Sequence, residues 1–255
     1  MRDGGGPAVQ GFRDATGRAD LDRVRRAFQA VAGAFAEAGH APRWPVHVVV
    51  ERMPIMGATQ SRPGEGHLVH VSLQAAESTM LDGLIAHEMG HVVRTEARHP
   101  SHNKLVHDRA VARAEVPRAF ARGFPRLARA AIGHAEDIYA DDLAIPLTLG
   151  ERSRPFFAEW VRNAMAMAGN GWDEVFGALD IAFSLGNLER HGLLGPRDPL
   201  RGEAKVFADG RKIASLEGLT GTYRDLPEPV TDKECEDHLA GLLATALDEL
   251  RGRPA

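Results

Sequence analysis

Apolar residues recur at helical and strand spacings along most of the chain. A helix is predicted from Asp20 to Gly39, because apolar side chains return to one face of it. That face consists of Leu21, Val24, Phe28, Val31 and Phe35. Val46–Glu51 contains three consecutive valines and is predicted to be a buried strand. Leu68–Leu73 is a second short apolar run and a second predicted strand, while the polar, glycine-bearing segment 57–66 is expected to connect the two.

Helices are predicted to dominate the rest of the chain. Residues 78–95 carry an apolar stripe at helical spacing, made of Met80, Leu84, Ile85, Met89 and Val92. Another helix can start near Pro125 and must end before Pro146, since proline cannot donate a backbone hydrogen bond inside a helix. Apolar stripes at the same spacing continue beyond a linker at 147–154.

These elements predict an α+β fold with three parts. Residues 1–17 are glycine-rich and polar, which is typical of a disordered segment. Residues 18–146 are expected to form a core with a small mixed sheet. Residues 147–255 are expected to form a mainly α-helical C-terminal region.

One predicted helix contains the sequence His87-Glu88-Met89-Gly90-His91, which is an HExxH pattern. Side chains four residues apart project from one helix face, so two imidazoles can bind the same zinc ion there. The glutamate beside the first histidine then lies next to a metal-activated water, from which it can take a proton. The alternative is a surface helix with unrelated histidines, but the rest of this helix is apolar.

With this motif the chain resembles the HExxH zinc metallopeptidases, the zincins, over residues 78–95 and, more broadly, about 46–145. The metzincin branch would continue as HExxHxxGxxH. Arg94 stands at the glycine position of that pattern and Ala97 at the third histidine position, so the resemblance is to the gluzincins. It implies a strand just before the metal helix, here Leu68–Leu73, that pairs with an extended substrate.

In gluzincins the third zinc ligand is a glutamate from a later helix, and the segment Gly133–Asp142 resembles that helix. An aspartate often follows the ligand by four residues and orients a zinc-bound histidine. This spacing pairs Asp137 with Asp141 and makes Asp137 the ligand. A glutamate is the usual residue, however, and Glu136 has the longer side chain, so Glu136 is the favoured ligand, with Asp137 as the alternative and His134 behind both.

Other candidates carry weaker signals. Tyr139 lies one turn from Glu136 and can stabilise a developing oxyanion as a catalytic residue, although a helical tyrosine is more often packed in a core. His99, His102 and His107 follow the motif in a predicted loop, where a lone histidine is more often solvated than catalytic.

Composition bounds the remaining possibilities. The chain has 255 residues, is 44% hydrophobic and has a formal net charge of −4, so it can bury a core and shows no basic surface for nucleic acid. No run approaches the roughly 18 apolar residues of a membrane span, and no secretory signal is visible. The one cysteine, Cys235, cannot form an intrachain disulfide, which is compatible with the cytoplasm, and its acidic neighbours disfavour a reactive thiolate.

The resemblance implies a zinc metalloendopeptidase-like hydrolase that acts on a peptide or protein substrate. His87, His91 and Glu136 would hold Zn²⁺, and Glu88 would be the general base. The alternative is a catalytically inactive zinc-binding or regulatory protein that keeps the same fold. The intact Glu88 favours the enzyme, because a structural zinc site does not need a base.

Overall fold

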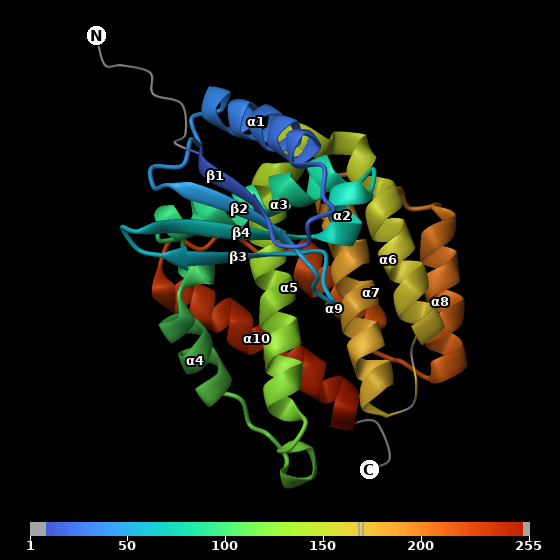
Figure 1. Ribbon diagram of the computed structural model, residues 1–255. Coiled ribbons are helices and arrows are strands. Elements are labelled where there is room, and N and C mark those ends of the chain that lie inside the picture. The colour runs from blue at the N-terminus through green and yellow to red at the C-terminus, as the bar shows by residue number, and fades with distance from the viewer. Residues whose placement is uncertain (1–8, 168, 170, 252–255) are drawn as a thin grey trace. The chain divides into compact units, whose positions relative to one another are not determined.

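The computed structural model describes residues 9–167, 169 and 171–251, and it has a mixed α+β fold with one small open sheet (Figure 1). The chain forms two compact units. The first, which we call the sheet unit, runs to His102 and also includes Ala140–Gly150. The second, the helical unit, consists of Asn103–Tyr139 and the chain from Glu151 onward.

Four strands form the sheet in the order β1-β2-β4-β3. They are β1 (Val9–Asp14), β2 (Val46–Glu51), β3 (Gly57–Arg62) and β4 (Gly66–Ser72). Strands β1, β2 and β4 are parallel neighbours, whereas β3 runs antiparallel to β4. The two strands predicted from apolar runs are confirmed as β2 and β4, and the sheet is mixed, as expected.

Two expectations about this sheet are wrong. Segment 57–62 is not a simple connection but the strand β3, which pairs with β4 from Gly57 to Arg62. Part of the segment 1–17 is also ordered, because β1 pairs with β2 from residue 9 onward, while residues 1–8 lie outside the described part of the chain. The expected pairing of Leu68–Leu73 with a substrate is also wrong. Strand β4 is paired on both sides, so its backbone cannot pair with a substrate, and β1 and β3 are the two outer strands.

Alternating valines explain how the sheet is covered. Val46, Val48 and Val50 lie on one face of β2 and are fully or almost fully buried, as are Val69 and Val71 on β4. They share one core with the apolar faces of α1 (Leu21–Glu37) and α3 (Leu81–Glu96). Helix α1 begins at an N-cap, Asp20, whose carboxylate accepts the backbone N–H of Arg23 at 2.9 Å. The short helix α2 (Leu73–Glu77) follows β4 directly.

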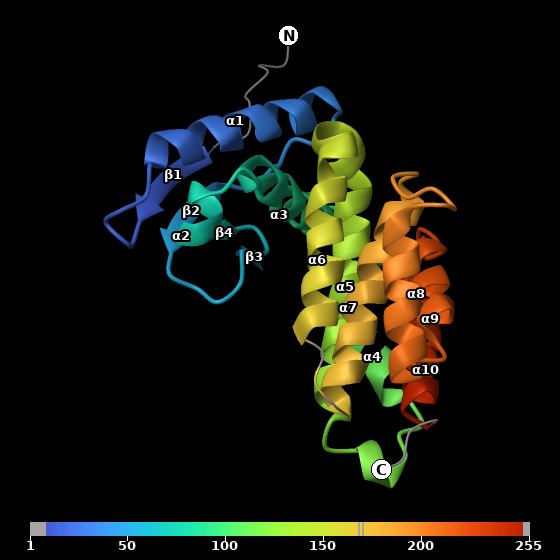
Figure 2. The same ribbon diagram turned by 90° about the vertical axis from the view of Figure 1, so that its right-hand side faces the viewer.

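The helical unit consists of packed helices, and α6, α7 and α8 lie side by side in it (Figure 2). Its α-helices are α4 (Lys104–Ala112), most of α5 (Phe124–Ala144), α6 (Ser153–Met167), α7 (Trp172–Arg190), α8 (Pro199–Arg211), α9 (Leu216–Arg224) and α10 (Asp232–Arg251). Helix α5 matches the helix predicted between Pro125 and Pro146. It is followed by a single π-helical turn at Ile145–Leu149.

The units divide the chain differently from the expected boundary between residues 146 and 147. Helix α4, early in the chain, packs against α10 at the end of it, so 103–139 joins the C-terminal helices. The last turn of α5, from Ala140, belongs to the sheet unit. Helix α5 is therefore one continuous helix with the boundary in its interior.

Candidate metal centre

Helix α3 places the two histidines of the HExxH pattern as the spacing predicts. The Nε2 atoms of His87 and His91 lie 3.2 Å apart, and the two rings meet edge to face with centroids 4.7 Å apart. Two nitrogens bound at about 2.0–2.1 Å to one tetrahedral zinc would lie about 3.3 Å apart. The pair therefore already has the separation of two ligands of one metal ion.

Asp141, in the last turn of α5, holds the first histidine. Its Oδ1 lies 2.8 Å from Nδ1 of His87, and its side chain is almost fully buried. An ionised carboxylate only accepts hydrogen bonds, so His87 carries its proton on Nδ1 and presents the lone pair of Nε2. In the alternative with Asp137 as the ligand, Asp141 was assigned to orient a histidine, and this contact has that form.

Asp137 is the acid that the structure brings to the histidines. His87, His91 and Asp137 each offer one ligand atom, and these atoms lie within 4.8 Å of one another. The position follows from helix α5 itself, because Asp137 precedes Asp141 by one turn of a continuous helix and shares its face. The stricter four-residue spacing thus describes the site better than the usual preference for glutamate.

Glu136, the favoured ligand from the sequence, takes a different place. It leaves the helix about 100° away from Asp137, and its Oε1 lies 3.9 Å from Nε2 of His107. Burial, and secondly the charge of Asp137, raise the pKa of Glu136 to about 8. His134 is also placed elsewhere, with Nε2 3.1 Å from Oδ1 of Asp180 and its ring stacked on Phe183.

Glu88 lies beside β3, one of the two outer strands of the sheet. Its side chain is buried, and its Oε2 accepts a hydrogen bond of 2.7 Å from the hydroxyl of Thr59 on β3. Gly57, two residues earlier on the same face of β3, comes so close that a Cβ there would lie 2.8 Å from Oε1 of Glu88. Sequence reasoning missed both residues. The only available signal was the alternation Gly57, Thr59, Ser61 of small residues that places all three on one strand face.

Helices α3 and α5 touch at a glycine inside the motif. A Cβ on Gly90 would lie 2.4 Å from the carbonyl oxygen of Ala140, a backbone atom that cannot rotate away. Ala140 itself is fully buried. This close approach places the last turn of α5, which carries Asp141, against α3.

The second histidine has a different kind of partner. Nδ1 of His91 lies 2.9 Å from Nε2 of His102, in the turn that follows α3. Nδ1 of His102 lies 2.8 Å from the hydroxyl of Ser101, which lies 2.7 Å from Nδ1 of His99. Two of the loop histidines named from the sequence thus connect to a motif histidine.

Tyr139 has a packing role in the helical unit. Its side chain is fully buried and its hydroxyl donates a hydrogen bond of 3.0 Å to the carbonyl oxygen of Pro227. This placement favours core packing over the expected catalytic role. Cys235 is also buried, and burial, with the charges of Asp232 and Glu136, raises the pKa of its thiol to about 12. A thiol with that pKa is not a nucleophile at neutral pH.

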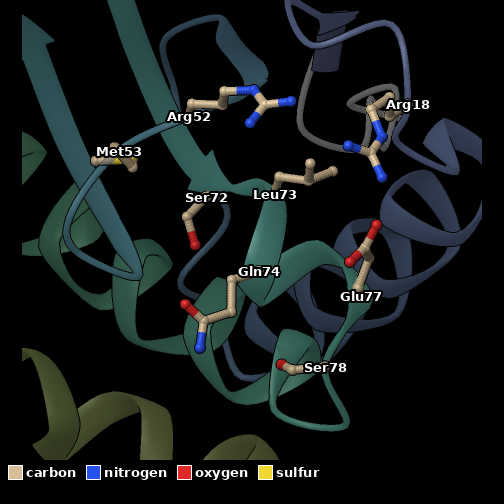
Figure 3. Close-up of a pocket in the computed structure, with 8 residues that line it drawn as sticks. All are labelled: Arg18, Arg52, Met53, Ser72, Leu73, Gln74, Glu77 and Ser78. Atoms are coloured by element: carbon tan, nitrogen blue, oxygen red, sulfur yellow. The ribbon is translucent and has the colours of Figure 1, made fainter.

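A separate pocket lies at the carboxyl ends of β2 and β4 (Figure 3). Arg18, Arg52 and Glu77 supply its charged groups. The residues that line it do not include the HExxH histidines or Glu88, so this pocket is distinct from the motif.

Comparison with known families assigns the chain to one of them. The model of a family described as a family of unknown function (DUF5781) matches residues 25–245. The chain belongs to the DUF5781 family. The match covers α3, β3 and α5, and so every residue of the candidate centre. No curated protein and no solved structure matches the chain. Among the residues that the structure describes, no helix has the length and apolar character needed to cross a bilayer.

Proposed function

We propose that this member of the DUF5781 family is a zinc-dependent peptidase with a gluzincin-like core. In this proposal His87, His91 and Asp137 bind zinc, Asp141 orients His87, and Glu88 is the general base. The observation that carries the proposal is the pair of Nε2 atoms 3.2 Å apart with Asp137 beside them. An aspartate in place of the usual glutamate is the one departure from the gluzincin pattern.

The residues present fit a zinc ion. Two imidazoles and one carboxylate are one of the donor sets found in catalytic zinc sites, which keep a fourth position open. The lone pair of His87 Nε2 points toward Nε2 of His91 at 3.2 Å, an arrangement that a cation between the two nitrogens stabilises. The carboxylates of Asp137 and Asp141 compensate the charge of a divalent ion.

Zinc and Glu88 would have different roles in the proposed hydrolysis. When bound, zinc lowers the pKa of a water molecule and polarises the scissile carbonyl. Glu88 accepts the proton of the attacking water and later passes it to the leaving amine. The hydroxyl of Thr59 donates to Oε2 of Glu88 at 2.7 Å and so holds the carboxylate in place.

The outer strand β3 is the part of the sheet that suits an extended peptide. Among the described residues it pairs with β4 alone, so its other side offers backbone N–H and C=O groups. The same strand carries Thr59 and Gly57 against Glu88. A peptide added to β3 would therefore run past the general base. This assigns to β3 the role that the sequence suggested for Leu68–Leu73.

A zinc-binding protein without catalysis is the alternative, and Glu88 separates the two. A structural site has no use for a buried carboxylate on the helix face beside the ligands. We also propose a cytoplasmic location, supported by the single, buried Cys235.

The test combines metal analysis with hydrolysis of an unfolded protein such as reduced, alkylated casein. We expect about one zinc per wild-type chain, and loss of zinc in His91→Ala, because two protein ligands bind the ion too weakly. We expect Glu88→Gln to keep zinc and to lose hydrolysis about 10²–10⁴-fold, since the amide cannot accept a proton. Glu37→Gln, an exposed change on α1, is the matched control and should behave as wild type.

Each result decides one part of the proposal. Zinc content at the wild-type level in His91→Ala would remove the ligand assignment. Hydrolysis by Glu88→Gln within about tenfold of wild type would remove Glu88 as the base. Stoichiometric zinc with no hydrolysis by wild type would favour the non-catalytic alternative.

A further inference from the structure

Four side chains form a hydrogen-bonded line from α3 to the turn that follows it. They are His91, His102, Ser101 and His99. The links are His91 Nδ1 to His102 Nε2 at 2.9 Å, His102 Nδ1 to Ser101 Oγ at 2.8 Å, and Ser101 Oγ to His99 Nδ1 at 2.7 Å. In each link the proton can belong to either atom, so the distances alone do not show which atom donates and which accepts. The direction matters because it decides whether Nε2 of His91 presents a lone pair or a proton.

The backbone N–H of Ser101 determines that direction. It donates to Nδ1 of His99 at 3.3 Å, and a backbone N–H can only donate. Nδ1 of His99 is therefore an acceptor, and the single proton of the Ser101 hydroxyl also points to it. Because the only hydroxyl proton of Ser101 is donated to His99, the oxygen of Ser101 must accept the proton on Nδ1 of His102.

The same logic continues to the metal centre. A neutral imidazole carries one N–H, so His102 with its proton on Nδ1 has a lone pair on Nε2. That lone pair accepts the proton on Nδ1 of His91. His91 is then left with a lone pair on Nε2, the atom that lies 3.2 Å from Nε2 of His87.

We propose that His102 is a positioning residue for His91, and that Ser101 and His99 hold His102 in the one tautomer that allows this. The inference rests on the proposed function, in which His91 is a zinc ligand. On the other side of the centre, Asp141 does the same for His87 with a carboxylate. The line from His99 achieves it without a carboxylate, so it adds no further negative charge to a site that already holds Asp137, Asp141 and Glu88.

Burial supports this assignment. Ser101 is 1% exposed and His99 is 8% exposed, so water has little access to the links that set the direction. The short 3₁₀ turn at Pro100–His102 brings these side chains back toward α3, and the backbone N–H of His102 bonds to the carbonyl oxygen of His99 at 2.9 Å. The line is thus held by backbone structure as well as by the side chains.

The test uses the full-length chain and two measurements. Imidazole ¹⁵N spectra of the zinc-free wild-type protein should show His91 and His102 with the proton on Nδ1. Zinc affinity, from competition with a chelator, should fall about 10–100-fold in His102→Leu, the range found when the partner of a metal-binding histidine is lost. His102→Gln should recover most of that loss, because the side-chain oxygen of glutamine can accept from Nδ1 of His91.

Ser101 provides the more specific variant. Ser101→Ala keeps His102 but removes the group that sets its tautomer, so we expect a mixture of His102 tautomers and zinc affinity reduced about tenfold, the lower end of the same range. Ser101→Thr keeps the hydroxyl and should match wild type, as should the control His47→Gln, an exposed histidine on β2. A merely structural role for His102 would not move the ¹⁵N signature of His91.

The outcomes separate this inference from the proposed function. A wild-type His102 with its proton on Nε2, or Ser101→Ala with unchanged tautomers and unchanged zinc affinity, would overturn the inference even if the protein hydrolyses peptides. A wild-type protein that binds no zinc would overturn the proposed function. The zinc-free spectra would still decide the direction of the hydrogen bonds in that case.

Discussion

Gly90 offers the sharpest test of how the centre is assembled. In an exposed helix interior, alanine in place of glycine stabilises by about 1 kcal/mol. At Gly90 the new Cβ would lie 2.4 Å from the carbonyl oxygen of Ala140 and 2.9 Å from its Cα, where ordinary contact begins at 3.4 Å. The two helices must therefore separate by about 1 Å.

The magnitude follows from these two opposing effects. Overpacking of a close core typically costs about 1–3 kcal/mol, and the upper end applies where backbone meets backbone. The gain in helix propensity is subtracted from this cost, so we expect the free energy of unfolding of Gly90→Ala to be about 2 kcal/mol lower than that of wild type. For a chain of this length that corresponds to a decrease in Tm of roughly 4–8 °C.

The same displacement reaches the metal ligands. Asp141 follows Ala140 directly, and its hydrogen bond to His87 is 2.8 Å long. An added separation of about 1 Å would break that bond, and loss of such a partner weakens metal binding by about 10–100-fold. Stability and zinc affinity should therefore fall together.

Thermal unfolding of the zinc-free protein and chelator competition measure the two effects. Gly33→Ala on α1 is the control, because a Cβ there meets no atom within 4 Å. That variant should gain up to about 1 kcal/mol and keep its zinc affinity. Gly90→Ala with wild-type Tm and zinc affinity would refute the close contact between α3 and α5.

Three further predictions concern single side chains. Asp137→Asn should weaken zinc binding more than Glu136→Gln in chelator competition, since a neutral amide is a poor ligand, and the reverse order would restore glutamate as the ligand. Thr59→Val should keep zinc but slow hydrolysis about 3–10-fold, because it loses one hydrogen bond to the general base, while Thr59→Ser should stay near wild type. An unchanged rate in Thr59→Val would show that this hydrogen bond does not contribute to hydrolysis. Glu96→Gln should destabilise the sheet unit by about 2–3 kcal/mol, because the buried carboxylate accepts the backbone N–H groups of residues 43 and 44. Burial alone would raise the pKa of Glu96, but these N–H groups and His67 together hold it below the ordinary value of 4.5. The unfolded chain therefore binds the proton more readily, so in chemical denaturation the difference between wild type and Glu96→Gln should be constant above pH 4.5 and shrink below it. A difference that grows with acidity would contradict this.

The motif histidines were predictable because covalent spacing on one helix determines their geometry. His87 and His91 lie four residues apart on an apolar helix, and no distant contact is needed to put their rings on one face. The role of Asp141 stayed open, because the four-residue spacing assigned it only in the alternative with Asp137 as the ligand. The fold class followed from long apolar periodicities such as those of α1 and β2.

The other features of the fold and site depended on tertiary contacts, which the spacing of apolar residues does not reveal. Strand β3 has small and polar residues with intermediate burial, so its segment looked like a loop, and only pairing with β4 makes it a strand. The choice between Glu136 and Asp137 depended on the rotation of α5 about its own axis, which spacing along the sequence does not fix. The line through Ser101 depends on one backbone N–H in a 3₁₀ turn.

The interrupted sheet unit has a consequence for how the protein is made. Its first segment ends at His102 and its second is Ala140–Gly150, so a ribosome releases the strands and both motif histidines long before the helix turn that completes the unit. Until that turn arrives, His87 lacks Asp141 and the close contact of Gly90 is absent. The complete set of contacts around His87 therefore forms only after Phe124–Ala144 has been synthesised.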